Sequence, residues 1–457
     1  MSLAKKWGLI GLATLSVLGA WAGAAAWSSH QVNSLLQHAA QNGWPDSSIK
    51  VRNLNHHAGL FNSSGEVELA YIDKCSSADQ PIWVQVQYDM SHVLLPTSMM
   101  QFEWRLQPTG ENKLAFEKIF AGTVALNGSG HMRLDQSFDT DLHLPALSSN
   151  TAGNHWEISP TVGFVRIGDD QFFLDVTTDR LSLRGNGDAV NAHQLNIHLD
   201  LDNHHHGTGN SAISFAKIEG SDLSLEGLKL SSKAQRQDGR YSMKMAYSLN
   251  KAHYKQHHLN DMNVTYVMNG MDANSVSQLI ALSGATCGFQ NLTRDEHQQM
   301  RSALKTLLTQ GFSAGLSNLH AKVEGGEVQA QLMFDVAKSD TDTVQLSQHL
   351  QAQGSLTMNG QVLNAEQQQS MLDVGFAKPS AKGLQANLHY AANKLLLNDK
   401  PFESPIVPMM LTELDKRLNA FLNNERHDNA QMLQSLLPAI PEADMPSADP
   451  SLTTSER

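Results

Sequence analysis

Cysteine is scarce in this chain of 457 residues, which contains only Cys75 and Cys287. Zinc sites built from Cys-x-x-Cys pairs are therefore excluded. In an oxidising compartment the two thiols could pair and close a long loop. The alternative is two unpaired thiols, because the sequence alone does not bring them within bonding distance.

Charge is also in short supply, since charged residues make up 17% of the chain and the net charge is −12 with neutral histidines. A typical soluble domain has about 25% charged residues. Nucleic-acid binding needs a basic stripe that neutralises phosphates, so we expect no nucleic-acid partner. An apolar partner, such as a lipid-like ligand, remains compatible with this composition.

Recognised catalytic motifs are missing. The chain has no His-Glu-x-x-His, no Gly-x-Ser-x-Gly and no Gly-rich phosphate loop. Among the 21 histidines, the adjacent groups at His56, His204 and His257 are predicted to lie in solvated turns, where neighbouring side chains cannot converge on one ion. We therefore expect no catalytic residue, no cofactor and no metal site. The alternative is a periplasmic hydrolase whose site is assembled from distant residues.

The N-terminus carries an apolar segment. Residues 7–27 contain no charge, follow Lys5 and Lys6, and precede a stretch without Lys or Arg that ends at Lys50. Such a segment can span a bilayer as a helix, and the positive-inside rule places the rest of the chain outside the cytoplasm. We predict a single-pass inner-membrane protein whose bulk lies in the periplasm. A cleaved signal peptide is the competing interpretation.

Most of the remaining chain alternates between apolar and polar residues, which indicates strands with one buried face. Gly227 breaks this alternation, and turns are predicted at Asn127-Gly128, Asp238-Gly239 and Asn269-Gly270. The predicted fold class is β-rich α+β, with long antiparallel meander sheets, a few packed amphipathic helices and one preceding transmembrane helix. The expected segments are a cytoplasmic stub (1–6), the anchor (7–27), a juxtamembrane helix or linker (28–48), a first β-rich region (49–271), a helical insert (272–320), a second β-rich region with a C-terminal helix (321–437) and a disordered tail (438–457).

One amphipathic helix is predicted over residues 293–319. Thr293 and Glu296 have capping-box spacing, and apolar residues then recur every three or four positions. Its stripe could pack on the sheet or cover an apolar groove. The candidate groove or lid residues are Leu304, Leu308, Phe312 and Leu316.

Three segments carry a family resemblance, namely residues 59–69 (Gly-Leu-Phe-Asn-Ser-Ser-Gly-Glu-Val-Glu-Leu), residues 264–272 and residues 395–401. Together with the apolar N-terminus, they resemble the YdgA-like family of proteobacterial envelope proteins, a domain of unknown function. The resemblance implies an envelope location and a β-rich architecture, and it implies no activity. We expect a non-enzymatic binding or scaffold protein for a lipid-like ligand or another envelope protein; the sequence leaves its oligomeric state open.

Overall fold

The computed structural model of the protein describes residues 49–423, except for 60, 72–81, 93–97, 111–112, 115–125, 136, 152–153, 186–187, 287, 290–291, 340 and 403–405. The predicted stub, anchor and linker (1–48), the predicted tail (438–457) and both cysteines lie outside the described residues. Among the described residues, no helix is long and apolar enough to cross a membrane.

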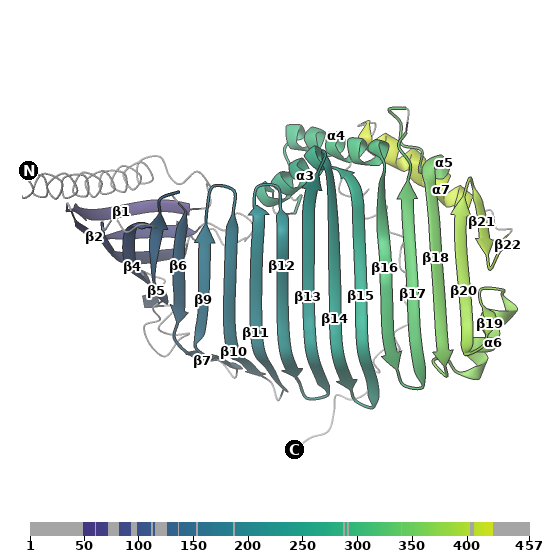
Figure 1. Ribbon diagram of the computed structural model, residues 1–457, viewed down its shortest axis with the longest axis horizontal. Coiled ribbons are helices and arrows are strands. Elements are labelled where there is room, and N and C mark those ends of the chain that lie inside the picture. Colours follow the sequence, from purple (N-terminus) through teal and green to yellow (C-terminus); the bar gives the residue numbers. More distant parts are fainter. Residues whose placement is uncertain are drawn as a thin grey trace, which may run out of the picture.

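The described strands join into one antiparallel sheet of 22 strands, most of which pair with their neighbours in the chain (Figure 1). The predicted β-rich meander is therefore confirmed. The strands are β1 (Ile49–Ala58), β2 (Asn62–Tyr71), β3 (Ile82–Ser91), β4 (Ser98–Pro108), β5 (Leu126–Arg133), β6 (Phe138–Leu144), β7 (Leu147–Thr151), β8 (Asn154–Ile158), β9 (Thr161–Ile167), β10 (Phe172–Gly185), β11 (Asp188–Asn203), β12 (Thr208–Glu219), β13 (Leu223–Gln237), β14 (Arg240–Tyr254), β15 (His257–Asp272), β16 (Phe312–Val323), β17 (Gly326–Val336), β18 (Leu350–Gly360), β19 (Lys378–Ser380), β20 (Gly383–Ala391), β21 (Lys394–Leu397) and β22 (Lys400–Pro401).

The strand register separates an apolar face of the sheet from a polar face. Residues that pair across neighbouring strands share a face, and successive residues along a strand alternate between faces. One row of paired residues from β11 to β16 is wholly apolar, and its members are Ile197, Ile213, Leu230, Tyr247, Val264 and Leu319. The neighbouring row on the other face is polar, and its members are Asn196, Ser214, Lys229, Ser248, Asn263 and His320.

A crease crosses the sheet where three alternate strands, β11, β13 and β15, carry residues with positive φ. These are Gln194 at 52°, Gly227 at 66° and Asp261 at 48°. The predicted break of phase at Gly227 is confirmed, and a side chain there would collide with the Asn250 amide group. Such irregularities shift the alternation by one residue, so Leu225 and Leu228 both extend apolar rows. The apolar face therefore continues past the crease.

Helices cover only parts of the apolar face (Figure 1). α3 (Ala273–Ala285) and α4 (Arg294–Gln310) pack at the end of the long central strands, together with α5 (Leu346–His349) and α7 (Ile406–Leu422). α6 (Ala365–Asp373) packs on the opposite corner, against Met358 and Leu384. Between these helices the face is less protected, and Ile213 and Tyr266 remain 41% and 42% exposed.

The predicted helix over 293–319 is confirmed from Arg294 to Gln310 and is wrong beyond that point. Gly311 ends the helix with a φ of 77°, and Phe312 begins β16. The register of β16 shifts between Leu316 and Leu319, which places both leucines on the same face of the sheet three positions apart. In the sequence, the bulge therefore gives apolar residues the same three-residue spacing that a helix would give them. The expected helical insert (272–320) is therefore helical only to Gln310, and β15 pairs directly with β16.

Two of the three predicted turns lie inside strands. The Asp238-Gly239 turn joins β13 to β14 as predicted. Asn269 and Gly270 instead belong to the end of β15, where the register shifts. Asn127 and Gly128 belong to β5, where a side chain at Gly128 would meet the Trp104 ring at 2.9 Å and the Asp141 carbonyl oxygen at closer range. The glycine therefore serves close packing under an aromatic ring, which local sequence cannot distinguish from a turn.

Candidate apolar binding site

α3 and α4 form a helical hairpin whose starts are fixed by side-chain caps. The Asp272 carboxylate accepts a hydrogen bond from the Ser275 amide at 2.8 Å and begins α3. At α4, the Glu296 carboxylate accepts one from the Thr293 amide at 2.7 Å, and this bond lowers the pKa of Glu296. The predicted capping box at residues 293–296 is therefore confirmed.

α7 returns from the far end of the sheet and is fastened beside α4. The Asp415 carboxylate accepts hydrogen bonds from the amides of Leu346 and Ser347 at 2.6 and 3.0 Å, which caps α5. The Asn419 amide group donates to the Val344 carbonyl at 2.7 Å. These bonds hold α7 so that Phe421 and Leu422 are buried against Met300 of α4.

A cavity of about 540 Å³ lies between this helical layer and the end of the sheet. Its size falls within the range of small-ligand sites, roughly 300–1,000 Å³. Every residue that lines it is apolar, and the set comprises Met271, Leu279, Phe289, Met300, Leu304, Leu307, Leu308, Phe312, Leu418, Phe421 and Leu422. This lining can hold a hydrocarbon chain but offers no group for bond-breaking chemistry.

Three of the four predicted groove residues line this cavity. Leu304 and Leu308 enter from α4, and Phe312 enters from the first position of β16. Leu316 does not line the cavity, because it lies in the sheet between Tyr266 and Leu332. The predicted place of Leu316 on the same helix as Leu304 and Leu308 is therefore wrong, since that helix ends at Gln310.

The sequence did not identify the opposite wall of the cavity. This wall consists of Leu418, Phe421 and Leu422 of α7, the predicted C-terminal helix, whose existence the structure confirms. Nothing in the local pattern shows that this helix faces α4, more than one hundred positions earlier in the chain. Phe289 was missed as well, and it lies in the short connection between α3 and α4.

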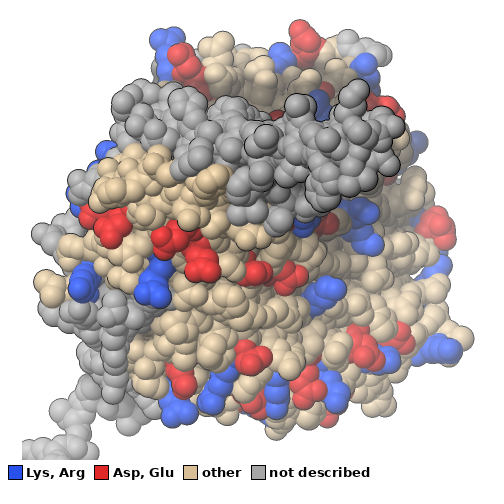
Figure 2. All heavy atoms as spheres, turned by 60° about the vertical axis from the view of Figure 1, so that its left-hand side comes forward, with Lys and Arg blue, Asp and Glu red and all other residues tan. Residues whose placement is uncertain are grey.

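A second, polar cleft of about 870 Å³ lies over the N-terminal strands. It is lined by acidic and histidine side chains that include Asp89, Glu103, Asp141, His57 and His131. Figure 2, in which the N-terminal side comes forward, shows acidic side chains gathered in a band on this side of the molecule. Asp89 and Glu103 lie directly opposite each other on β3 and β4, where two like charges repel.

Ser63, which lines the cleft, pairs with the buried His92 in a way that resembles a nucleophile and its base. The Ser63 hydroxyl and the His92 Nε2 lie 2.6 Å apart. Burial, followed by repulsion from His56, lowers the pKa of His92. The side chains of Ser63 and His92 are only 3% and 0% exposed, so a substrate carbonyl cannot reach the hydroxyl in this arrangement.

The described histidines do not assemble a metal site, because no cluster of three or more potential ligands occurs within the described ranges. His204, His205 and His206 lie in a turn as predicted. His257 and His258 were also expected in a turn, and they instead begin β15, directly after the turn that joins it to β14. His56 and His57 were expected in a turn and lie in β1 instead, where the ring of His56 bonds to the Tyr88 hydroxyl at 2.8 Å.

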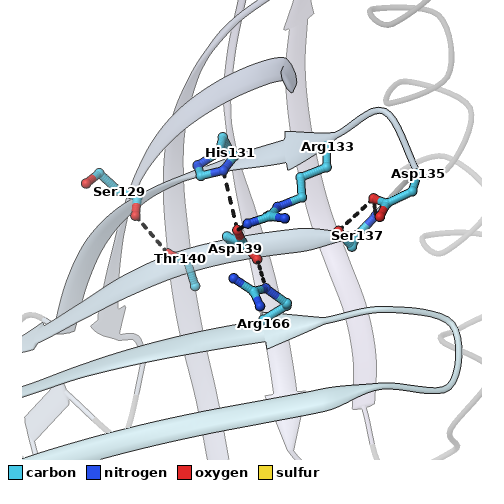
Figure 3. A network of polar contacts seen from close by, with 8 residues as sticks. All are labelled: Ser129, His131, Arg133, Asp135, Ser137, Asp139, Thr140 and Arg166. Atoms are coloured by element: carbon cyan, nitrogen blue, oxygen red, sulfur yellow. Dashed lines mark hydrogen bonds and ion pairs between the residues drawn. The ribbon is translucent and has the colours of Figure 1, made fainter. Parts of the chain in front are cut away.

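Beside the cleft, the buried Asp139 is the centre of an ion-pair network with partly exposed partners (Figure 3). Its carboxylate accepts from Arg166 Nε at 2.7 Å and lies 2.6 Å from Arg133 Nη2, and His131 Nε2 lies 3.4 Å away. Burial alone would raise the pKa of Asp139, but the hydrogen bonds and charges of the two arginines outweigh burial and lower it. The network ties β5, β6 and β9 together.

Comparison with known proteins gives one family match. The model of a family described as "Bacterial protein of unknown function (DUF945)" matches residues 4–405. No curated protein and no solved structure matches the chain.

Proposed function

The chain belongs to the DUF945 family of bacterial proteins of unknown function, and we propose that it is a non-enzymatic binding protein for a lipid-like ligand in the bacterial envelope. The hydrocarbon chain of that ligand occupies the cavity between α4, α7 and the sheet. We also propose, as a more specific assignment, that the chain is a YdgA-like protein.

The observation that carries the proposal is the uniform lining of the cavity. Eleven apolar side chains from both layers surround it. Each methylene group that leaves water for such a site gains about 0.8 kcal/mol. The cavity adjoins the apolar face, since Met271 and Phe312 are positions of β15 and β16 that also line it. A long chain could therefore extend from the cavity onto the sheet.

The N-terminal sequence supports a location at the inner membrane. A charge-free segment at residues 7–27 follows two lysines, and no Lys or Arg occurs again before Lys50. This pattern is typical of a helix that anchors a periplasmic domain. A binding protein anchored in this way would lie close to the lipids of the inner membrane.

Replacing Leu308 with tryptophan tests the proposal by filling the cavity. The indole ring of tryptophan is larger than the leucine side chain and should displace part of the bound hydrocarbon chain. Excluding even two methylenes costs about 1.6 kcal/mol, so dodecanol should bind about tenfold more weakly or worse. Binding to the full-length protein in phosphatidylcholine nanodiscs can be measured by calorimetry, with a parallel thermal unfolding scan.

Ser302→Trp is the matched control, because Ser302 lies on the exposed side of the same helix. Its binding should equal that of the unchanged protein. Equal binding by all three proteins would contradict the proposal, as would an equal loss in both variants. Loss of a co-purifying envelope protein without any change in dodecanol binding would instead indicate a protein partner. Turnover of a substrate would support the hydrolase alternative.

A further inference from the structure

Arg301 is a largely buried cation without a partner among the described residues of the helical layer. Its side chain is only 7% exposed. The described part of the chain offers it no hydrogen bond and no ion pair. The carboxylate of Glu296 is bonded to Thr293 instead. An unpaired charge removed from water is costly, so a buried arginine is normally paired.

A second polar group without a partner lies one helical turn before Arg301. The Nδ1 atom of His297 is buried, and no described residue bonds to it. Residues four apart lie on the same side of a helix, so the two side chains are neighbours on α4. Two neighbouring polar groups thus lack partners at the same place.

These two residues continue the stripe that lines the cavity. His297, Arg301, Leu304 and Leu308 follow one another at spacings of four, three and four, which defines a single helix face. Leu304 and Leu308 line the cavity, as does Met300, the residue before Arg301. A chain lying along Leu308 and Leu304 would therefore bring its end group toward Arg301.

We propose that Arg301, assisted by His297, binds the oxyanion head group of an anionic amphiphile whose chain fills the cavity. This inference rests on the proposed function and specifies the ligand class. A planar guanidinium matches a carboxylate or phosphate with two parallel hydrogen bonds. The oxyanion would supply the missing partner, and the apolar wall would supply affinity for the chain.

The test compares ligands of equal chain length that differ only in the head group. Dodecanoate, dodecyl phosphate and dodecanol are titrated into the full-length protein in phosphatidylcholine nanodiscs. A charge-assisted hydrogen bond contributes enough to favour an anion about tenfold to one hundredfold. The unchanged protein should prefer one or both anions over dodecanol by this factor, and their ranking shows whether the head group is a carboxylate or a phosphate.

Two substitutions separate head-group recognition from packing. Arg301→Met keeps an unbranched apolar stem but removes the guanidinium, and should abolish the preference while leaving dodecanol affinity unchanged. Arg301→Lys keeps the charge but not the planar fork and should retain part of the preference. Lys416→Met, at an exposed position of α7, is the charge-matched control and should keep the full preference.

Each outcome has a distinct meaning. If dodecanol binds and neither anion is preferred, the head-group inference is overturned while the proposed function stands. If Arg301→Met weakens dodecanol and the anions equally, Arg301 supports only the packing of the helix, and the inference is again overturned. If none of the three ligands binds the unchanged protein, the proposed function itself fails.

Discussion

Replacing Met358 with aspartate should lower the free energy of unfolding by about 4 kcal/mol, because it removes a packed side chain and buries an unpaired carboxylate. Met358 is 7% exposed and packs with Ala377, Leu384 and Ala386 beneath α6. The apolar face at this corner has no cation that could pair with the new charge among the residues of that cluster.

The matched control is Thr357→Asp, one position earlier on β18. Thr357 pairs with Gln329 and Gln385 on the polar face. The same substitution should cost less than about 1 kcal/mol there. Urea denaturation of both variants measures the difference. Similar losses at the two positions would show that the assignment of faces, and with it the apolar surface, is wrong.

Replacing Asp139 with asparagine should destabilise the protein by about 3 kcal/mol at neutral pH, because two arginines then lose the carboxylate that joins them. Arg133 and Arg166 are 39% and 37% exposed, so water partly solvates their charges once the carboxylate is gone. The loss of stability therefore stays below that of a fully buried ion pair. Asp141→Asn, two positions further on β6 at an exposed site, should cost less than about 0.5 kcal/mol.

The Asp139 effect should depend on pH in a defined direction. Its pKa is lower in the folded protein than in the unfolded chain, so the carboxylate stabilises the fold above the ordinary aspartate pKa of about 4. This contribution is lost as the pH falls through the folded-state pKa. Urea midpoints of the two proteins should therefore differ at pH 7 and converge in acid. A constant difference at all pH values would contradict the ion-pair explanation.

Strands were predictable from the sequence wherever one face of the strand is apolar and the other is polar and exposed to solvent. β11 shows this, because Leu195, Ile197, Leu199 and Leu201 alternate with polar residues as the pattern required. The glycine at 227 was recognised as a break of phase for the same reason. Which strands pair, and how far one sheet extends, depends on contacts that no short segment contains.

The errors arose where two structures share one local pattern. A bulge in β16 placed Leu316 and Leu319 three apart on one face, which is also the spacing of a helix. Only Gly311 marked the boundary. In β5, Gly128 suggested a turn, but the Trp104 ring on the neighbouring strand is what requires a residue without a side chain. That requirement is invisible without the partner strand.

The candidate site was predicted in part because apolar residues recur along one face of α4 at helical spacing. The sequence placed Leu304 and Leu308 on it, and both line the cavity. The wall formed by Leu418 and Phe421 depends on the return of α7 across the sheet, which periodicity does not encode. Arg301 occupies the same helix face as these leucines, and a charge within an apolar stripe was the signal that could have identified it.

Photoaffinity mapping tests the central claim most directly. Dodecanoate with a diazirine at the end of its chain would be cross-linked to the full-length protein, and labelled peptides would be identified by mass spectrometry. The account predicts labelling within α4 (Arg294–Gln310) and α7 (Ile406–Leu422), which excess unlabelled dodecanoate and the Leu308→Trp substitution both suppress. Labelling that avoids both helices, or that neither treatment changes, would contradict an apolar ligand site beneath the helical layer.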